Sequence, residues 1–261
     1  MPTRYLAILT LASLCVSCDQ WDLGVKIPFV ATWNGEPLAC DSTAPALTDL
    51  RFYVSDPQLI DNDGRSHDVR FATEMPWQND AVALIDLENG DGMCLNGTQG
   101  VFSYLVGVAQ AGEYRGLRFT VGVPFSLNHE NPLTAGPPLD DSDMHWHWRS
   151  GYKFLRAGIR TENDGFWIHV GSTACEGTVG HVTGCRFPNR IRIELPGFVP
   201  GESTVAIDLA RLVAGVNLED GSSGDCSSGP AETSCVAPFT ALGIDHATGK
   251  QEGTQSVFSV Q

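Results

Sequence analysis

The chain has 261 residues, contains eight cysteines and is acidic, with a formal net charge of −15. A negative charge of this size repels phosphate backbones, so we exclude nucleic acid as a partner. The length is sufficient for one large domain with a substantial apolar core.

The first 18 residues predict an export signal. Arg4 supplies a positive charge, and residues 6–14 form an apolar run that is too short to span a bilayer. The run ends in Cys15-Val-Ser-Cys18, which resembles a bacterial lipoprotein processing box, although an ordinary signal peptide cut nearby is the alternative. We expect residues 1–18 to be a signal peptide with lipidated Cys18, and residues 19–261 to form one periplasmic domain. Lipoprotein sorting rules imply an anchor in the inner membrane, because Asp19 follows Cys18.

The six remaining cysteines predict three disulfides, because an exported chain meets an oxidising compartment. Six cysteines allow fifteen pairings. The short spacings favour Cys175–Cys185 and Cys226–Cys235, which leaves Cys40 with Cys94. None has the spacing of a zinc ribbon or of a redox-active pair.

Short apolar or alternating runs separated by turn signals predict an all-β, single-domain, β-sandwich-like fold stapled by disulfides. Residues 152–160 and 166–171 flank Glu162-Asn-Asp-Gly165 and therefore predict a hairpin. The other expected strands cover residues 25–33, 50–54, 81–87, 114–123, 190–195 and 236–244.

One short helix is expected over residues 209–214, with Asp208 as its N-cap and Gly215 at its exit. The long segment 124–143 contains four prolines and little periodicity. Loops of this length within a compact domain are usually functional or disordered.

The proline-rich segment leads into Met144-His145-Trp146-His147-Trp148. In an extended strand, Met144, Trp146 and Trp148 share one face while His145 and His147 share the other. The predicted hairpin returns His169 toward this segment, and His129 lies within the preceding loop. Histidines ringed by tryptophan and methionine suit a soft metal, and an apolar surround favours Cu(I).

Two other interpretations use the same residues. His145, His147 and His169 have a spacing found in β-sheet zinc enzymes, so they could form a zinc site that activates water in a hydrolase or lyase. Alternatively, the domain binds no metal and is a β-rich surface-binding module, with the Trp-x-Trp pair packed in its core.

Six stretches of the chain together form a recognisable pattern. They are Gly122-Val-Pro-Phe-Ser-Leu-Asn-His129, Met144-His-Trp-His-Trp-Arg-Ser-Gly-Tyr-Lys-Phe154, His169-Val-Gly-Ser-Thr-Ala-Cys175, Cys185-Arg-Phe-Pro-Asn189, Val205-Ala-Ile-Asp-Leu-Ala-Arg-Leu212 and the segment from Cys226 to Cys235. In order, and over nearly all of the mature chain, they resemble the MbnP family, the methanobactin-operon-associated periplasmic copper proteins that are also known as the four-Cys-motif members of the metallo-mystery pair.

The resemblance implies a β-sandwich-like protein that is not an enzyme and that binds one Cu(I) in copper homeostasis. It implies that Trp146 is oxidised to kynurenine by a partner, a dihaem protein similar to MauG and cytochrome c peroxidase. The metal ligands it implies are His129, His169 and Trp146 as kynurenine. Met144, His147 and Trp148 are then expected around the metal rather than as ligands.

Overall fold

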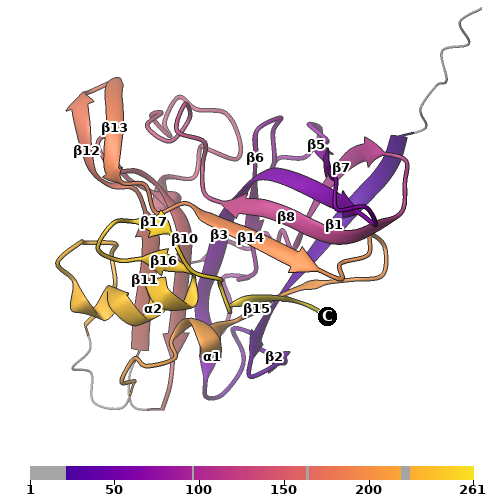
Figure 1. Cartoon of the computed structure of the whole chain (residues 1–261). Coiled ribbons are helices and arrows are strands. Elements are labelled where there is room, and N and C mark those ends of the chain that lie inside the picture. The colour runs from indigo at the N-terminus through magenta and orange to yellow at the C-terminus, as the bar shows by residue number, and fades with distance from the viewer. Residues whose placement is uncertain (1–21, 96, 163–164, 219–223) are drawn as a thin grey trace, which may run out of the picture.

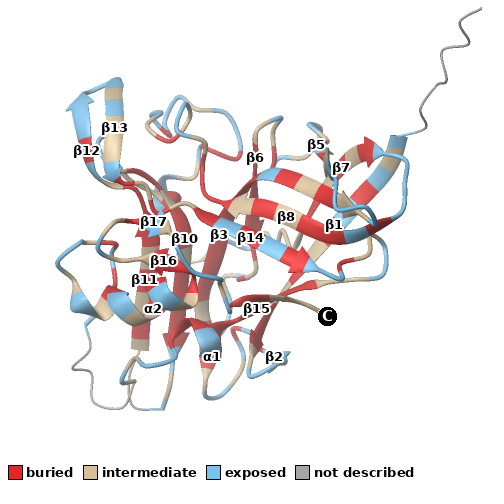
Figure 2. Ribbon diagram, viewed as in Figure 1, coloured by how far each residue is buried: buried red, intermediate tan, exposed pale blue. Residues whose placement is uncertain are grey.

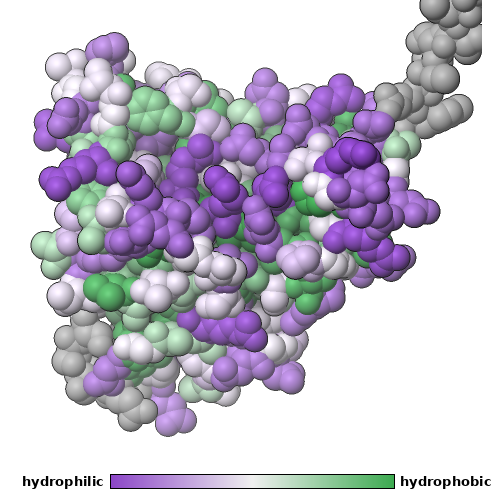
Figure 3. All heavy atoms as spheres, viewed as in Figure 1, coloured by the Kyte–Doolittle hydropathy of each residue, from purple (hydrophilic) through white to green (hydrophobic). Residues whose placement is uncertain are grey.

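We describe a computed structural model of the protein, in which residues 22–95, 97–162, 165–218 and 224–261 are described. The expected signal peptide and the lipidated Cys18 lie outside these residues. No helix within the described ranges is long and apolar enough to cross a membrane. The face seen in Figure 3 mixes hydrophilic and hydrophobic side chains.

Two sheets form the body of the protein (Figure 1). Within the described residues the larger sheet has eight strands, with the order β11-β10-β3-β8-β14 and three short strands paired beside this path. These strands are β3 (Ala46–Asp61), β4 (Ser66–Asp68), β6 (Val82–Asp86), β8 (Tyr114–Val121), β9 (His145–His147), β10 (Gly151–Arg160), β11 (Gly165–Gly171) and β14 (Ile191–Pro196).

The second sheet has six strands in the described part of the chain, with the order β18-β15-β1-β7-β5 and β2 beside β1. Its strands are β1 (Asp22–Trp33), β2 (Glu36–Pro37), β5 (Arg70–Phe71), β7 (Tyr104–Gln110), β15 (Val205–Asp208) and β18 (Phe258–Val260). Two hairpins stand apart from both sheets, namely β12 (Thr173–Thr178) with β13 (His181–Phe187) and β16 (Ile244–Asp245) with β17 (Lys250–Gln251).

The core lies between the two sheets. Phe29 of the smaller sheet contacts Phe52 and Phe119 of the larger sheet edge-on, with ring centroids 5.5 and 5.9 Å apart. Phe258 completes the cluster. These side chains are buried, and Figure 2 shows burial concentrated along the strands. The arrangement confirms the β-sandwich-like fold expected from the alternating strands.

A second, smaller apolar cluster covers the opposite face of the larger sheet. The loop between β8 and η1 (Ser142–Met144) packs Leu139 and Met144 against Tyr53 and Tyr152. The tyrosine hydroxyls donate to the carbonyls of Pro138 and Leu139. The proline-rich segment is therefore an ordered cover over this sheet, which gives a physical reason for its length.

Most of the predicted elements are confirmed. The hairpin is β10 paired with β11, and its bulge lies between Lys153 and Leu155. The predicted helix is α1 (Leu209–Leu212), and the Asp208 side chain accepts a hydrogen bond from the Ala210 amide. All three favoured disulfides are formed, joining Cys40 to Cys94, Cys175 to Cys185, and Cys226 to Cys235.

The strand predicted over residues 236–244 is wrong. This segment begins as α2 (Val236–Ala241), which follows the short turn η2 (Thr233–Cys235). Phe239 and Leu242 are three residues apart and both are buried, which is the spacing of one helix face. A short apolar run does not distinguish such a helix from a buried strand. The helix forms here because only one face of the segment packs on the core.

Candidate metal site

The Trp-x-Trp segment forms a tight hairpin with the start of β10. His145 lies opposite Tyr152, and His147 lies opposite Gly151. Asp141 caps the preceding turn η1 by accepting from the amides of Asp143 and Met144. The strand β9 therefore has only three residues, and the chain turns back at Trp148.

This short strand changes the predicted faces. Met144 belongs to η1 rather than to the strand, and it is fully buried. Trp148 lies in the turn and lines the same cleft as His145, although an extended strand would place these two side chains on opposite faces. The difference arises because strand alternation ends at His147.

Trp146 packs against Gly171 at the end of β11. A Cβ atom added to Gly171 would lie 2.5 Å from Cζ3 of Trp146 and 2.7 Å from the carbonyl oxygen of Tyr152. Glycine is therefore required for the indole to approach the strand so closely. Gly171 and His169 are two residues apart on β11, so they face the same side of the sheet. The Trp146 ring thus lies next to His169 along the strand.

His169 points away from the sandwich core, whereas its neighbours Ile168 and Val170 point into it. Its Nε2 atom is buried and has no hydrogen-bond partner among the described residues. Burial, together with the nearby cations Lys153, Arg156 and Arg51, lowers the pKa of His169 to about 4. The imidazole is therefore neutral at physiological pH, which is the form that binds a metal.

His145 has the same two properties. Its Nε2 atom is also buried without a hydrogen-bond partner in the described part of the chain, and its ring contacts Tyr152 edge-on. Burial lowers the pKa of His145, with smaller contributions from His147, His129 and Lys153. His145 is therefore a second neutral imidazole with an unused donor atom, on the strand that carries Trp146.

His129 is held in a defined tautomer. Its Nδ1 atom lies 3.1 Å from the carbonyl oxygen of Trp148, so Nδ1 carries the proton and donates it. The Nε2 atom is then unprotonated; it accepts from the Asn128 amide nitrogen at 3.4 Å and lies 3.6 Å from Sγ of Cys185. Burial lowers the pKa of His129, so this ring is also neutral. A histidine that donates one N–H to a carbonyl and presents the other nitrogen is typical of metal ligands.

His147 is different, because both of its ring nitrogens are used locally. Its Nδ1 atom accepts from the Arg149 amide at 3.2 Å, and its Nε2 atom lies 3.3 Å from Oγ of Ser150. The side chain is exposed in the turn. His145, His147 and His169 do not form a group with ligand atoms within 4.8 Å of one another among the described residues. The same is true of His129, His145 and His169, so the zinc triad is disfavoured by the local hydrogen bonds of His147 and not by distance.

Comparison with known proteins identifies the family. The family model described as MbnP matches residues 23–228. The chain belongs to the MbnP family. Its structure is similar to that of MbnP from Methylosinus trichosporium, with a TM-score of 0.79 and 26% sequence identity over 92% of this chain and 98% of the other. No curated protein matches the sequence.

The MbnP-family chain has a cleft of about 730 Å³ beside the site. His129, His145 and Trp148 line it, together with Glu130 and His181. His181 belongs to β13, and the sequence analysis did not select it or Glu130. The only available signal for His181 was its place in a glycine-rich hairpin between two cysteines, which does not show that the hairpin leans toward His129.

Proposed function

We propose that this protein is an exported, lipid-anchored copper protein of the periplasm that holds one Cu(I) beside Trp146. The observation that supports the proposal best is the pair of half-buried, neutral imidazoles, His145 and His169, whose Nε2 atoms are buried without a hydrogen-bond partner among the described residues. Leaving such atoms unpaired is costly unless something else binds them. Cu(I) suits this set because imidazole ligands and an apolar surround favour a soft ion of low charge.

The ligands we propose are His169 and His129, with Trp146 as kynurenine. His145 joins them as a donor on the strength of its unpaired Nε2 atom. Met144, His147 and Trp148 surround the ligands. Met144 is fully buried behind the hairpin, and Trp148 is held through its carbonyl by His129. The protein itself is then a metal carrier and not an enzyme.

The partner we propose is a dihaem protein similar to MauG and cytochrome c peroxidase, which oxidises Trp146 to kynurenine. In this reaction the C2–C3 bond of the indole breaks, and each of these carbons gains an oxygen atom from hydrogen peroxide, which leaves as water. Hydrolysis then releases C2 as formate. The product carries an amine and a ketone where the apolar indole ring stood. Trp146 is half-buried rather than sealed in the core, which suits oxidation through the protein surface.

Peptide mass spectrometry combined with metal analysis tests this function, after expression with and without the dihaem partner. We expect kynurenine at Trp146 only with the partner, together with one bound copper. Trp77 is the internal control, because its indole N–H donates to the Tyr104 carbonyl and its ring stacks on Phe102, away from the histidines. Oxidation of Trp77 to the same extent as Trp146 would contradict a directed reaction.

The ligand assignment is tested by alanine substitutions. We expect His169→Ala and His129→Ala to weaken Cu(I) binding by more than about 100-fold, above the range seen for residues that only support a ligand. His246→Ala is the matched control, because the Nε2–H of His246 donates to the Gly229 carbonyl and its ring contacts Phe239 edge-on. Unchanged copper stoichiometry in both ligand variants would reject the assignment.

A further inference from the structure

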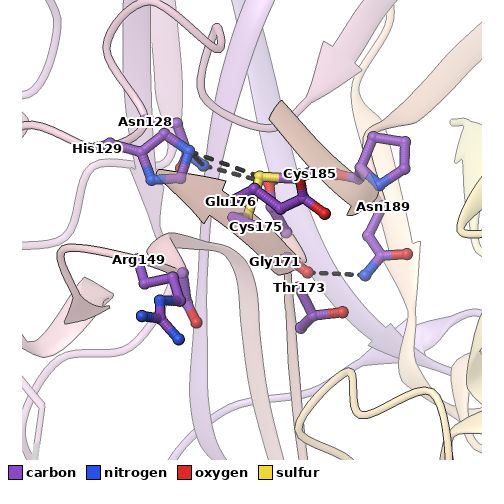
Figure 4. Close-up of a disulfide and its surroundings, with 12 residues drawn as sticks. Asn128, His129, Arg149, Gly171, Thr173, Cys175, Glu176, Cys185 and Asn189 are labelled. Carbon is purple, nitrogen blue, oxygen red and sulfur yellow. Dashed lines mark hydrogen bonds between the residues drawn. A yellow bond between two sulfur atoms is a disulfide. The ribbon is translucent and has the colours of Figure 1, made fainter. Parts of the chain in front are cut away.

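The disulfide Cys175–Cys185 lies directly beside His129 (Figure 4). The two cysteines face each other across the hairpin of β12 and β13. The Nε2 atom of His129 and both sulfur atoms all lie within 4.8 Å of one another. The figure shows a ring nitrogen of His129 directed at the sulfur of Cys185, so the atom that faces the disulfide is a possible metal donor.

The orientation of His129 is fixed from the other side. Because its Nδ1–H donates to the carbonyl of Trp148, the ring presents an unprotonated Nε2 to the sulfurs. Asn128 places its side-chain amide 3.4 Å from the same Nε2 atom and also donates to Ser172, so the ring sits in a built pocket. In the disulfide form the sulfurs are weak ligands, whereas thiolates are strong ligands for soft metals.

We propose that reduction of the Cys175–Cys185 disulfide creates a second soft-metal site, formed by the two thiolates and Nε2 of His129. The reductant is a dithiol, which becomes a disulfide while the Cys175–Cys185 bond breaks and both sulfurs gain a proton. Metal binding then releases these two protons to solvent. Two sulfurs and one imidazole suit Cu(I) or Zn²⁺. The site therefore binds metal only in the reduced protein.

The position of the hairpin allows both reduction and metal entry. The strands β12 and β13 project from the edge of the molecule (Figure 1), and Cys185 is half-buried. Cys185 and Asn128 line a cavity of about 220 Å³. His129 lines the larger cleft of about 730 Å³. A metal can therefore reach the three ligand atoms without opening the sandwich core.

The Cys226–Cys235 disulfide provides a natural control. Glu232 lies beside it, and these three side chains also have ligand atoms within 4.8 Å of one another. Both cysteines are completely buried, and the backbone of Cys226 pairs with β11 through Trp167 and His169. Cys185 is half-buried, so we expect the more accessible hairpin disulfide to be reduced before Cys226–Cys235.

This inference goes beyond the copper site proposed above, and the two share only His129. The copper site needs His169 and Trp146 and forms in the oxidised protein. The second site needs Cys175 and Cys185 and forms only after reduction. His169→Ala should therefore remove the first site and keep the second, so failure of either proposal can be recognised separately.

Titration with Co²⁺ tests the inference, because thiolate ligands give cobalt a charge-transfer absorption in the near ultraviolet. The full-length mature protein is used, either oxidised or treated with a dithiol under mild conditions. Alkylation and mass spectrometry identify which disulfide has opened. We expect one equivalent of thiolate-bound Co²⁺ in the reduced protein and none in the oxidised protein, and Cu(I) should displace it.

The variants assign the ligands. The double variant Cys175→Ser with Cys185→Ser should lose the absorption, and His129→Gln should weaken Co²⁺ binding by at least about tenfold. The double variant Cys226→Ser with Cys235→Ser and the variant His169→Ala should both keep it. If the absorption is missing from reduced protein that has a free Cys175 and Cys185, the inference is wrong. It is equally wrong if the absorption survives loss of both hairpin cysteines.

Discussion

Along β3, Leu50, Phe52 and Val54 point into the core between the sheets, whereas Asp49 and Arg51 point to the opposite face. The inner side chains contact only apolar neighbours. The outer ones are equally buried but charged, and Arg51 bonds to Asp49 at 2.7 Å. The same strand therefore supports two environments. On the inner face the apolar side chains need only to fit their neighbours, whereas on the outer face each buried polar atom needs a hydrogen-bond partner.

The outer face forms a row across the sheet. Arg51 lies opposite Asp86 on β6 and Arg156 on β10, and Arg156 in turn lies opposite His169 on β11. The charges in the middle of the row are paired with Asp49 and Asp141. At the end of the row, the Nε2 atom of His169 has no hydrogen-bond partner within the described part of the chain. The comparison shows that the side chain able to bind a metal is the last one in the row, His169, and that the rigid strands around it fix its position.

The largest expected effect comes from the inner face. Phe52→Ala removes a fully buried ring that contacts Phe29 and Phe258, so we expect the free energy of unfolding to fall by about 3–5 kcal/mol. Denaturant unfolding measures this change, with Leu133→Ala as the control because Leu133 is 85% exposed. Copper bound per folded molecule should not change. A loss of copper in the folded fraction would mean that the two faces are not independent.

The outer face should show a pH dependence that the inner face lacks. Burial and the nearby charge of Glu88 together raise the pKa of Asp86 to about 7, against hydrogen bonds from Thr98 and the Glu88 amide. Between about pH 4 and 7 the folded protein therefore holds a proton that the unfolded chain has lost. Stability contributed by Asp86 falls as pH rises through this window, by up to about 4 kcal/mol.

Asp86→Asn tests this dependence, because the amide cannot ionise. We expect the variant to lose the decline in unfolding free energy between about pH 4 and 7. Denaturant unfolding across this range measures it, and Asp63→Asn is the control at an exposed turn. If the unfolding free energy of Asp86→Asn still declined with pH as in the unchanged protein, another titratable group on the row would be responsible for the decline.

A smaller effect is expected where Trp146 meets the sheet. Gly171→Ala forces the indole or the Tyr152 backbone to move, so we expect a loss of about 1–3 kcal/mol in stability and slower oxidation of Trp146 by the dihaem partner. Gly165→Ala is the control on the same strand, because its added Cβ would lie 3.4 Å from the Ile159 carbonyl oxygen. Equal oxidation rates in both variants would show that close packing of Trp146 on Gly171 does not position the indole for oxidation.

The smallest effect concerns the cations beside the histidines. Lys153 lowers the pKa of both His145 and His169, so Lys153→Met should raise both values toward the ordinary range, while burial keeps them low. Proton titration of the metal-free protein by NMR measures the shift. Lys250→Met, at an exposed position, should leave both unchanged. If Lys153→Met lowered the pKa of His145 or His169, Lys153 would not be a cation that disfavours the charged imidazoles.

The sequence alone determined the sandwich, most strands and the capped helix at Asp208, and it favoured the two short-range disulfides, which left Cys40–Cys94 by elimination. These depend on local spacing, since side-chain alternation, turn residues and short cysteine separations act over a few neighbours. It also selected His129, His169 and Trp146. The helix α2 was missed because its apolar run is too short to show a period.

Only the tertiary structure decided which donor atoms are left unpaired. His145 and His147 are equivalent in the sequence pattern, yet His147 spends both nitrogens in a turn while His145 keeps a buried Nε2. The contact between His129 and Cys185 joins residues 56 positions apart, and His181 reaches the cleft only because the β12–β13 hairpin leans toward the loop. Hydrogen-bond satisfaction depends on long-range packing, which local residue patterns do not record.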